Sequence, residues 1–155
     1  MTKKSLSLSK GGLALAVFVA YLAFCAFFFT YGIDKMQEVA NRLGKEQTLG
    51  GIGVAFLLTF ALIALVAFAV PEVMFLISFI GNFVNKGKTI GFTVVSLVAE
   101  IISIAVLLFL TNFFIAGVEY DILSIVIMGI FDLLVLVSFV HSIIVLVKQK
   151  TADEE

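Results

Sequence analysis

Long apolar segments alternate with short polar connectors along this chain, a pattern typical of membrane-spanning helices. A helix needs about 20 apolar residues to cross the hydrocarbon, because each residue rises about 1.5 Å through a layer about 30 Å thick. Four segments reach this length: residues 12–31, 51–80, 89–117 and 122–147. The pattern therefore predicts an all-α fold, a polytopic membrane protein whose four transmembrane helices form a single bundle over residues 1–150.

The second segment contains Pro71, the only proline of the chain. Proline has no N–H, so at this position it would leave the carbonyl of Ala67 without its helical partner. We therefore predict a kink in the second helix at Pro71. A re-entrant break is the alternative, and it would require the broken backbone to be buried in protein or to face water.

The connectors differ in length. Residues 32–50 form the longest one, and apolar positions recur there at helical spacing, which predicts a short interfacial helix over 33–43 or a continuation of the first span. The connectors at 82–88 and 118–121 are short, so the third and fourth segments should form an antiparallel hairpin. Residues 151–155 are polar, and we expect them to form a short, disordered cytoplasmic tail.

The distribution of Lys and Arg predicts the orientation, since cytoplasmic connectors carry an excess of both. One side of the predicted bundle holds seven: Lys3, Lys4, Lys10, Lys86, Lys88, Lys148 and Lys150. The other side holds three: Lys35, Arg42 and Lys45. Both termini are therefore expected in the cytoplasm, with the plasma membrane as the expected location.

Composition supports a membrane protein and excludes several functions. The chain is 62% hydrophobic, against about 45–50% in soluble domains. Its formal net charge of −1 gives no strong overall field that would point to nucleic acid. One cysteine, Cys25, excludes a disulfide within the chain, and one histidine, His141, excludes a haem held by two histidines of this chain.

Motifs of catalysis and cofactor binding are missing from the sequence. There is no nucleophile elbow, no phosphate-binding glycine loop and no H-E-x-x-H pattern. We therefore expect neither an enzyme nor a protein that holds a metal or an organic cofactor. The expected surroundings are the lipid bilayer and either further copies of the chain or another membrane protein.

Polar residues of the third segment fall on one face. At about 100° per residue, Glu100 and every Ser and Thr between Thr93 and Thr111, including Ser96 and Ser103, occupy an arc of about 80°. Lipid cannot satisfy such a stripe, so it should face protein or a watery cavity. Interhelical hydrogen bonding explains the hydroxyl groups alone. An intramembrane carboxylate is costly, however, and Glu100 is therefore a candidate functional residue.

Asp132 is the second candidate, because it lies near the middle of the fourth segment as Glu100 lies near the middle of the third. In an antiparallel hairpin their levels would differ by roughly 8–10 Å, so a bridging water is an easier link than direct contact. No Lys or Arg lies within the four predicted segments to neutralise them. The two acids would thus be protonated, or compensated by a cation, a water-filled path or a partner chain.

Glu72 and His141 are weaker candidates. Glu72 follows Pro71, where an interface acid at a bend and a functional group are equally good interpretations. His141 follows Asp132 by nine residues, which places the two side chains about 180° apart around one helix and roughly 13 Å apart along it. His141 could instead approach Glu72 or Glu100 from a neighbouring helix, although a lone histidine near a membrane end is more often an interface residue.

Two functions fit these features. The first is a small ion- or proton-coupled channel or transporter, with a pathway formed between subunits of an oligomer. Its ion- or proton-binding residues would be Glu100 and Asp132, supported by the following residues: Glu72, His141, Ser96 and Ser103.

The second is a non-transporting membrane subunit, assembly factor or immunity-type protein whose buried acids bind a partner. The two hypotheses differ in what Glu100→Gln and Asp132→Asn should change. Flux or its pH dependence would be lost under the first, and a co-purifying partner would be released under the second.

Overall fold

The computed structural model describes residues 3–32, 34, 38, 41, 50–85, 90–117 and 122–154. Helices make up this part of the chain, and it contains no strand. The elements are α1 (Lys3–Phe27), which continues as the π-helix η1 (Phe28–Gly32), α3 (Gly50–Asn85), α4 (Gly91–Gly117) and α5 (Ile122–Glu154). The predicted all-α architecture with four long helices is confirmed.

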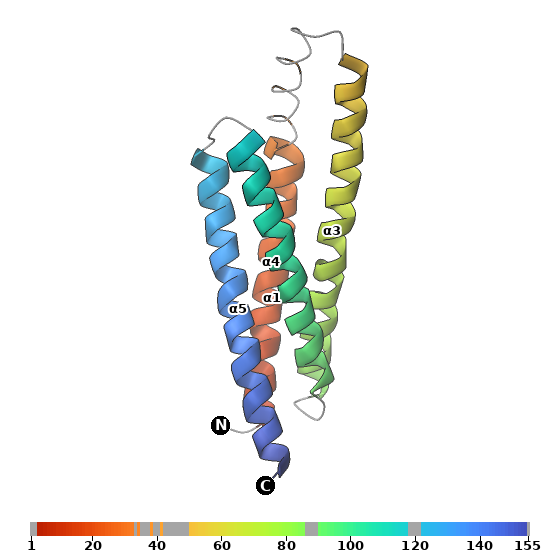
Figure 1. Ribbon diagram of the computed structural model, residues 1–155. Coiled ribbons are helices and arrows are strands. Elements are labelled where there is room, and N and C mark those ends of the chain that lie inside the picture. The colour runs from red at the N-terminus through yellow and green to blue at the C-terminus, as the bar shows by residue number, and fades with distance from the viewer. Residues whose placement is uncertain are drawn as a thin grey trace.

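The four long helices form an elongated bundle in which each runs antiparallel to the next (Figure 1). Helix α1 packs against α3 and α5, and α4 packs against the same two helices, so α1 and α4 lie diagonally across the bundle. The start of α1 and the end of α5 lie at one end, together with the end of α3 and the start of α4. We call this the termini end.

Helix boundaries extend beyond the predicted segments at this end. Helix α1 begins at Lys3 rather than at residue 12, and α3 continues to Asn85. Helix α5 continues to Glu154, so the prediction of a disordered tail from residue 151 is wrong for these positions. A prediction from hydropathy places the end of a segment at the first charged residue. The helix itself continues wherever its polar side chains find hydrogen-bond partners.

Other predictions fall on parts of the chain that the structure leaves undescribed. Most of the expected interfacial helix over 33–43, the turn at 118–121 and the basic residues of the connectors lie outside the described residues. Pro71 is inside α3, which is a single helix on both sides of it, so the alternative of a re-entrant break is wrong. The kink at Pro71 is not confirmed and stays a prediction.

The surface of the bundle is apolar, and part of its interior is polar. All four long helices are long and apolar enough to cross a membrane. Large apolar side chains stand on the outside, such as Leu62, Val66 and Leu133, which are 64%, 63% and 65% exposed. Meanwhile Lys10 and Glu100 are buried. This arrangement is the reverse of a soluble domain and suits a hydrocarbon surrounding.

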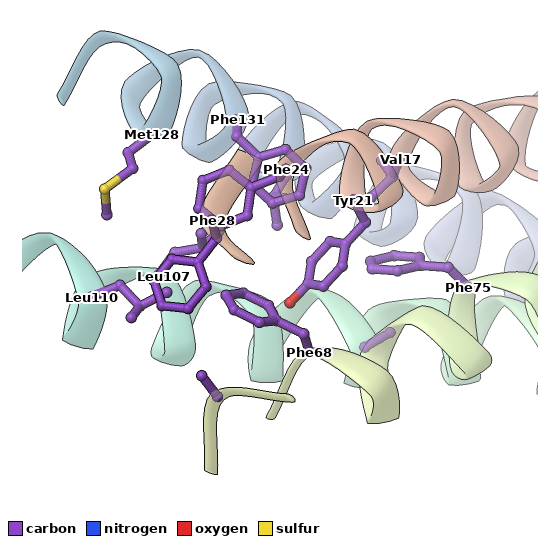
Figure 2. Packing of buried hydrophobic residues seen from close by; sticks show 13 residues of the cluster. Val17, Tyr21, Phe24, Phe28, Phe68, Phe75, Leu107, Leu110, Met128 and Phe131 are labelled. Atoms are coloured by element: carbon purple, nitrogen blue, oxygen red, sulfur yellow. The ribbon is translucent and has the colours of Figure 1, made fainter. Parts of the chain in front are cut away.

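Aromatic side chains fill the core away from the termini end (Figure 2). Tyr21 of α1 meets the rings of Phe68 and Phe131 edge-on, at centroid distances of 5.7 and 5.1 Å. Phe24 stacks on Phe131 at 5.0 Å and meets Phe68 at 5.6 Å. Such pairs contribute about 0.5–1.5 kcal/mol each beyond the area they bury. This aromatic core joins α1, α3 and α5.

Two glycines permit close helix packing near the termini end. A Cβ placed on Gly81 of α3 would lie 2.0 Å from Cδ1 of Phe92 in α4, which is far closer than atoms can approach. A Cβ on Gly11 of α1 would lie 3.4 Å from the Cβ of Asn82 in α3. Small residues thus hold α1 and α4 close to α3 at this end, where the polar side chains described next have to meet.

Candidate functional site: a buried ion pair and two outer carboxylates

Lys10 and Glu100 form an ion pair in the interior of the bundle. The Nζ atom of Lys10 lies 2.6 Å from Oε1 of Glu100, and both side chains are 0% exposed. Lys10 comes from α1 and Glu100 from α4, so the pair crosses the diagonal of the bundle. An ion pair with no access to solvent is stable only if its remaining protons and lone pairs are also satisfied.

Serine hydroxyls complete the surroundings of this pair. Ser96 of α4 donates to Oε1 of Glu100 at 3.2 Å, Ser142 of α5 donates to Oε2 at 2.7 Å, and Ser138 of α5 also donates to Oε1. The ammonium of Lys10 donates to Oε1, to Oγ of Ser138 at 3.1 Å and to the carbonyl of Ser138 at 3.3 Å. All three ammonium protons therefore have acceptors, and both carboxylate oxygens have donors.

This geometry corrects one sequence-based expectation. We expected no cation within the spans to neutralise the acids, and that expectation is wrong for Glu100. Lys10 was counted among the cytoplasmic flanking charges, but it lies inside α1 and within a stretch that can cross a membrane, Lys4–Tyr31. Hydropathy alone places a charged residue outside the apolar segment that it flanks. In the folded bundle, a partner of opposite charge on another helix can stabilise that residue in the core.

A second polar layer lies closer to the termini end and joins all four helices. Ser7 of α1 donates to the carbonyl of Asn82 in α3 at 2.7 Å, and Nδ2 of Asn82 donates to the carbonyl of Ser78 at 3.0 Å. Thr93 of α4 lies 3.3 Å from Oε1 of Gln149 in α5 and 3.4 Å from Oδ1 of Asn82. These side chains are buried, so the termini half of the core is held by hydrogen bonds.

The polar stripe of α4 faces the interior, as predicted. Thr93, Ser96, Glu100 and Ser103 are each 0% exposed. Their roles differ, however. Ser96 contacts Glu100, whereas Ser103 donates to the carbonyl of Ala99 at 2.8 Å on its own helix. Of the two serines that we singled out as supporting residues, only Ser96 belongs to the surroundings of the ion pair.

Asp132 lies apart from Glu100. Six residues separate it from Ser138, or about 9 Å along α5, and the oxygens of Glu100 are already bound by Lys10 and serines. The Asp132 side chain is half-buried. It has no hydrogen bond or ion pair among the described residues. The structure therefore does not bring together the two acids that we expected to act as a pair.

Glu72 is also half-buried and has no hydrogen bond or ion pair within the described part of the chain. It lies on α3 close enough to Tyr21 and Cys25 of α1 for its charge to act on both. Asp132 and Glu72 thus stand on different helices, Glu72 near the middle of a stretch that can span a membrane and Asp132 about a third of the way along another.

His141 has no hydrogen bond or ion pair with a carboxylate among the described residues. Its Nε2 lies 3.3 Å from Oγ of Ser9 in α1. Ser9 donates its own proton to the carbonyl of Leu6 at 2.9 Å, so its oxygen is free to accept from Nε2. Nδ1 is buried without a partner among the described residues. The predicted approach to Glu72 or Glu100 is replaced by a contact with α1, beside Lys10.

Sequence reasoning missed the three main partners of Glu100, which are Lys10, Ser138 and Ser142. One signal for Lys10 was available. Ser7, Lys10, Ala14 and Val17 recur at spacings of three and four residues, and this places Lys10 on the face that later buries Tyr21. Ser138 and Ser142 are likewise one turn apart on one face of α5.

Comparisons with known proteins add no assignment. No protein-family model, no curated protein and no solved structure matches this chain. Among the described residues, no group of three or more His, Cys, Asp or Glu side chains could hold a metal ion. The charges of the site are therefore its main chemical feature: one internally neutralised pair, and two carboxylates with no partner among the described residues.

Proposed function

We propose that this chain is an integral membrane protein that binds another membrane protein within the bilayer, as a non-transporting subunit, an assembly factor or an immunity-type protein. The observation that carries this proposal is the difference between its acids. Glu100 is satisfied inside the bundle, whereas Asp132 is half-buried within its span and has no hydrogen bond or ion pair among the described residues. A carboxylate facing hydrocarbon is costly, and a partner from another chain removes that cost.

Glu100 is a poor carrier site in this arrangement. A proton or ion carrier has to release and rebind its cargo, which requires access and free ligand atoms. The carboxylate of Glu100 is 0% exposed, and its oxygens already accept from Lys10 and from serines of two helices. These contacts suit a permanent connection between helices, so we assign the pair a structural role.

Proton-coupled transport is the second candidate, and one observation favours it. Buried polar groups extend from Gln149 and Asn82 at the termini end as far as Glu100. Such a row could conduct protons if the helices parted. Under this alternative Glu100 would be the proton-binding residue, and its substitution would remove flux.

We also propose the plasma membrane as the location, with both termini in the cytoplasm. The excess of Lys on the termini side supports this orientation, and it persists after Lys10 is assigned to the interior. The surface side chains of Lys4, Lys148 and Lys150 are exposed at that end. There they can meet water and anionic headgroups.

Reconstitution into liposomes that contain a pH-sensitive dye separates the two candidate functions. Our proposal predicts no proton flux above that of empty liposomes at any imposed pH gradient. Flux that is present in the parent and lost in Glu100→Gln would overturn it in favour of transport. Glu100→Gln also breaks the ion pair with Lys10 and so affects the packing of the bundle. Ser142→Ala is the control for this effect, because it removes a single hydrogen bond from the same carboxylate and keeps its charge.

Photo-crosslinking in the native membrane tests the partner directly. A crosslinking residue at Leu133, beside Asp132 and 65% exposed, should give a discrete adduct with another protein. Asp132→Asn should reduce that adduct strongly, since it removes the charge and keeps the shape. A crosslinker at Leu62, on a different helix and 64% exposed, is the matched control and should trap lipid instead.

A further inference from the structure

A glycine lies one turn from Asp132 on the outer surface of α5. Gly129 and Asp132 are three residues apart, so they share a face of the helix. A Cβ added to Gly129 would meet no atom within 4 Å. The backbone of α5 is therefore open to the surroundings at this point. Together with the neighbouring exposed residues Leu133 and Leu136, these two positions form what we call the Gly129 face.

The Gly129 face points away from α1. At about 100° per residue, Asp132 lies about 90° around α5 from the centre of its buried side and about 180° from His141. His141 contacts Ser9 of α1, so Asp132 projects on the other side of α5. Within the described part of the chain this face is open to the outside of the bundle, since Gly129, Leu133 and Leu136 are exposed.

Two independent features of this face favour a transmembrane helix as its occupant. An exposed glycine lets the backbone of a second helix approach closely, as small residues do at helix contacts in membranes. A carboxylate at mid-span requires a counter-charge or a hydrogen-bond donor at the same depth. A lipid chain would fill the space at Gly129 but would leave Asp132 unsatisfied.

The charge of the occupant follows from what this chain lacks. Between residues 11 and 31, 51 and 85, and 89 and 147 there is no Lys or Arg, and Lys10 is already paired with Glu100. A second copy of the chain therefore has no free cation to offer at mid-span. Two copies that met symmetrically at this face would bring two Asp132 side chains close together, which is unfavourable unless a proton is shared.

We infer that the Gly129 face binds a transmembrane helix of a different protein, one that carries a Lys or Arg in its middle third. The partner's cation would meet Asp132, about 15 Å along the axis from the start of α5. The partner's backbone would pack over Gly129 one turn away. This inference rests on the proposed function and adds to it the chemical class of the partner.

Synthetic transmembrane peptides provide the test. Each probe is a Leu/Ala helix of about 22 residues with one central guest residue, which is Lys, Leu, Asn or Glu. Energy transfer between labelled peptide and labelled protein in lipid vesicles measures binding. We expect the Lys probe to bind the parent roughly tenfold more tightly than the Leu probe, equivalent to about 1.4 kcal/mol.

Two variants connect this binding to the face. Asp132→Asn should abolish the preference for Lys over Leu. Gly129→Leu should weaken the binding of both probes, because it covers the exposed backbone at this position. It should leave the bundle intact, since Gly129 is exposed and a Cβ there meets no atom within 4 Å. Glu72→Gln removes the other outer carboxylate and should change neither result.

The outcomes separate this inference from the proposed function. Tighter binding of the Asn or Glu probe would retain an intramembrane partner but overturn a cationic one. Equal, weak binding of all four probes would overturn both. Self-association that Asp132→Asn abolishes would identify a second copy as the occupant and refute a different protein.

Discussion

At the scale of single residues, Lys10 and Glu100 illustrate why a buried ion pair is informative about architecture and a weak source of stability. Removing two charges from water costs free energy that can exceed what their mutual attraction in the interior regains. The cost is offset here by serines that saturate both groups. The pair therefore selects one arrangement of α1 and α4, because any other arrangement leaves a charge without partners.

Single substitutions in this pair should be far more damaging than the double one. Lys10→Met or Glu100→Gln alone leaves an uncompensated buried charge or a broken network, and we expect each to lower the free energy of unfolding by about 3–5 kcal/mol. The double variant Lys10→Met with Glu100→Met should recover most of that loss. Denaturant unfolding in detergent micelles measures all three. Single variants as stable as the double would contradict the role of the pair.

The residue scale also shows what the sequence could reveal. Glu100 and Ser96 were recognisable, because helical periodicity alone places them on a polar face. Lys10 was not, since a charge at the edge of an apolar segment is read as flanking. Its partner lies 90 residues away, and only the packing of α1 against α4 reveals the pair.

At the scale of helices, the contact of α3 with α4 depends on one missing side chain. Gly81→Ala would place a methyl carbon 2.0 Å from Cδ1 of the Phe92 ring. Either the ring or the helix has to move, at an expected cost of about 1–3 kcal/mol. Thermal unfolding in detergent should show this loss for Gly81→Ala.

A control for that substitution is available on α1. Gly12 is exposed, and a Cβ there meets nothing within 4 Å. Gly12→Ala should be neutral or slightly stabilising, because alanine is the better helix former. If Gly12→Ala were as destabilising as Gly81→Ala, the loss at Gly81 could not be assigned to the close contact with Phe92.

Helices were easier to predict than their ends. Length and hydropathy were enough to identify all four, because an apolar run of this length has few alternatives to a spanning helix. The same signals did not give the helix ends, because α1 begins at Lys3 and α5 continues to Glu154, both beyond the apolar segments. Those extensions depend on Ser7, Lys10 and Gln149, which are buried by other helices.

At the scale of the whole molecule, the bundle places the start of α1 and the end of α5 at the same end (Figure 1). Cysteine scanning can test this, because Cys25 is the only cysteine to remove. In a Cys25→Ser background, Ser5→Cys and Thr151→Cys should react with a membrane-impermeant thiol reagent only after the membrane is opened. Labelling of one position in intact cells and the other only in opened ones would contradict the fold.

The diagonal ion pair has a consequence for how the chain enters a membrane. Lys10 is synthesised long before Glu100, since 90 residues separate them. Before α4 is inserted, an unpaired lysine is most stable near the headgroups. We therefore expect the nascent first helix to lie at a shallower depth in the membrane until then. The first helix can therefore take its final depth only after α4, the third long helix, has been translated. The order of membrane insertion thus depends on a contact between two helices that are not consecutive in the chain.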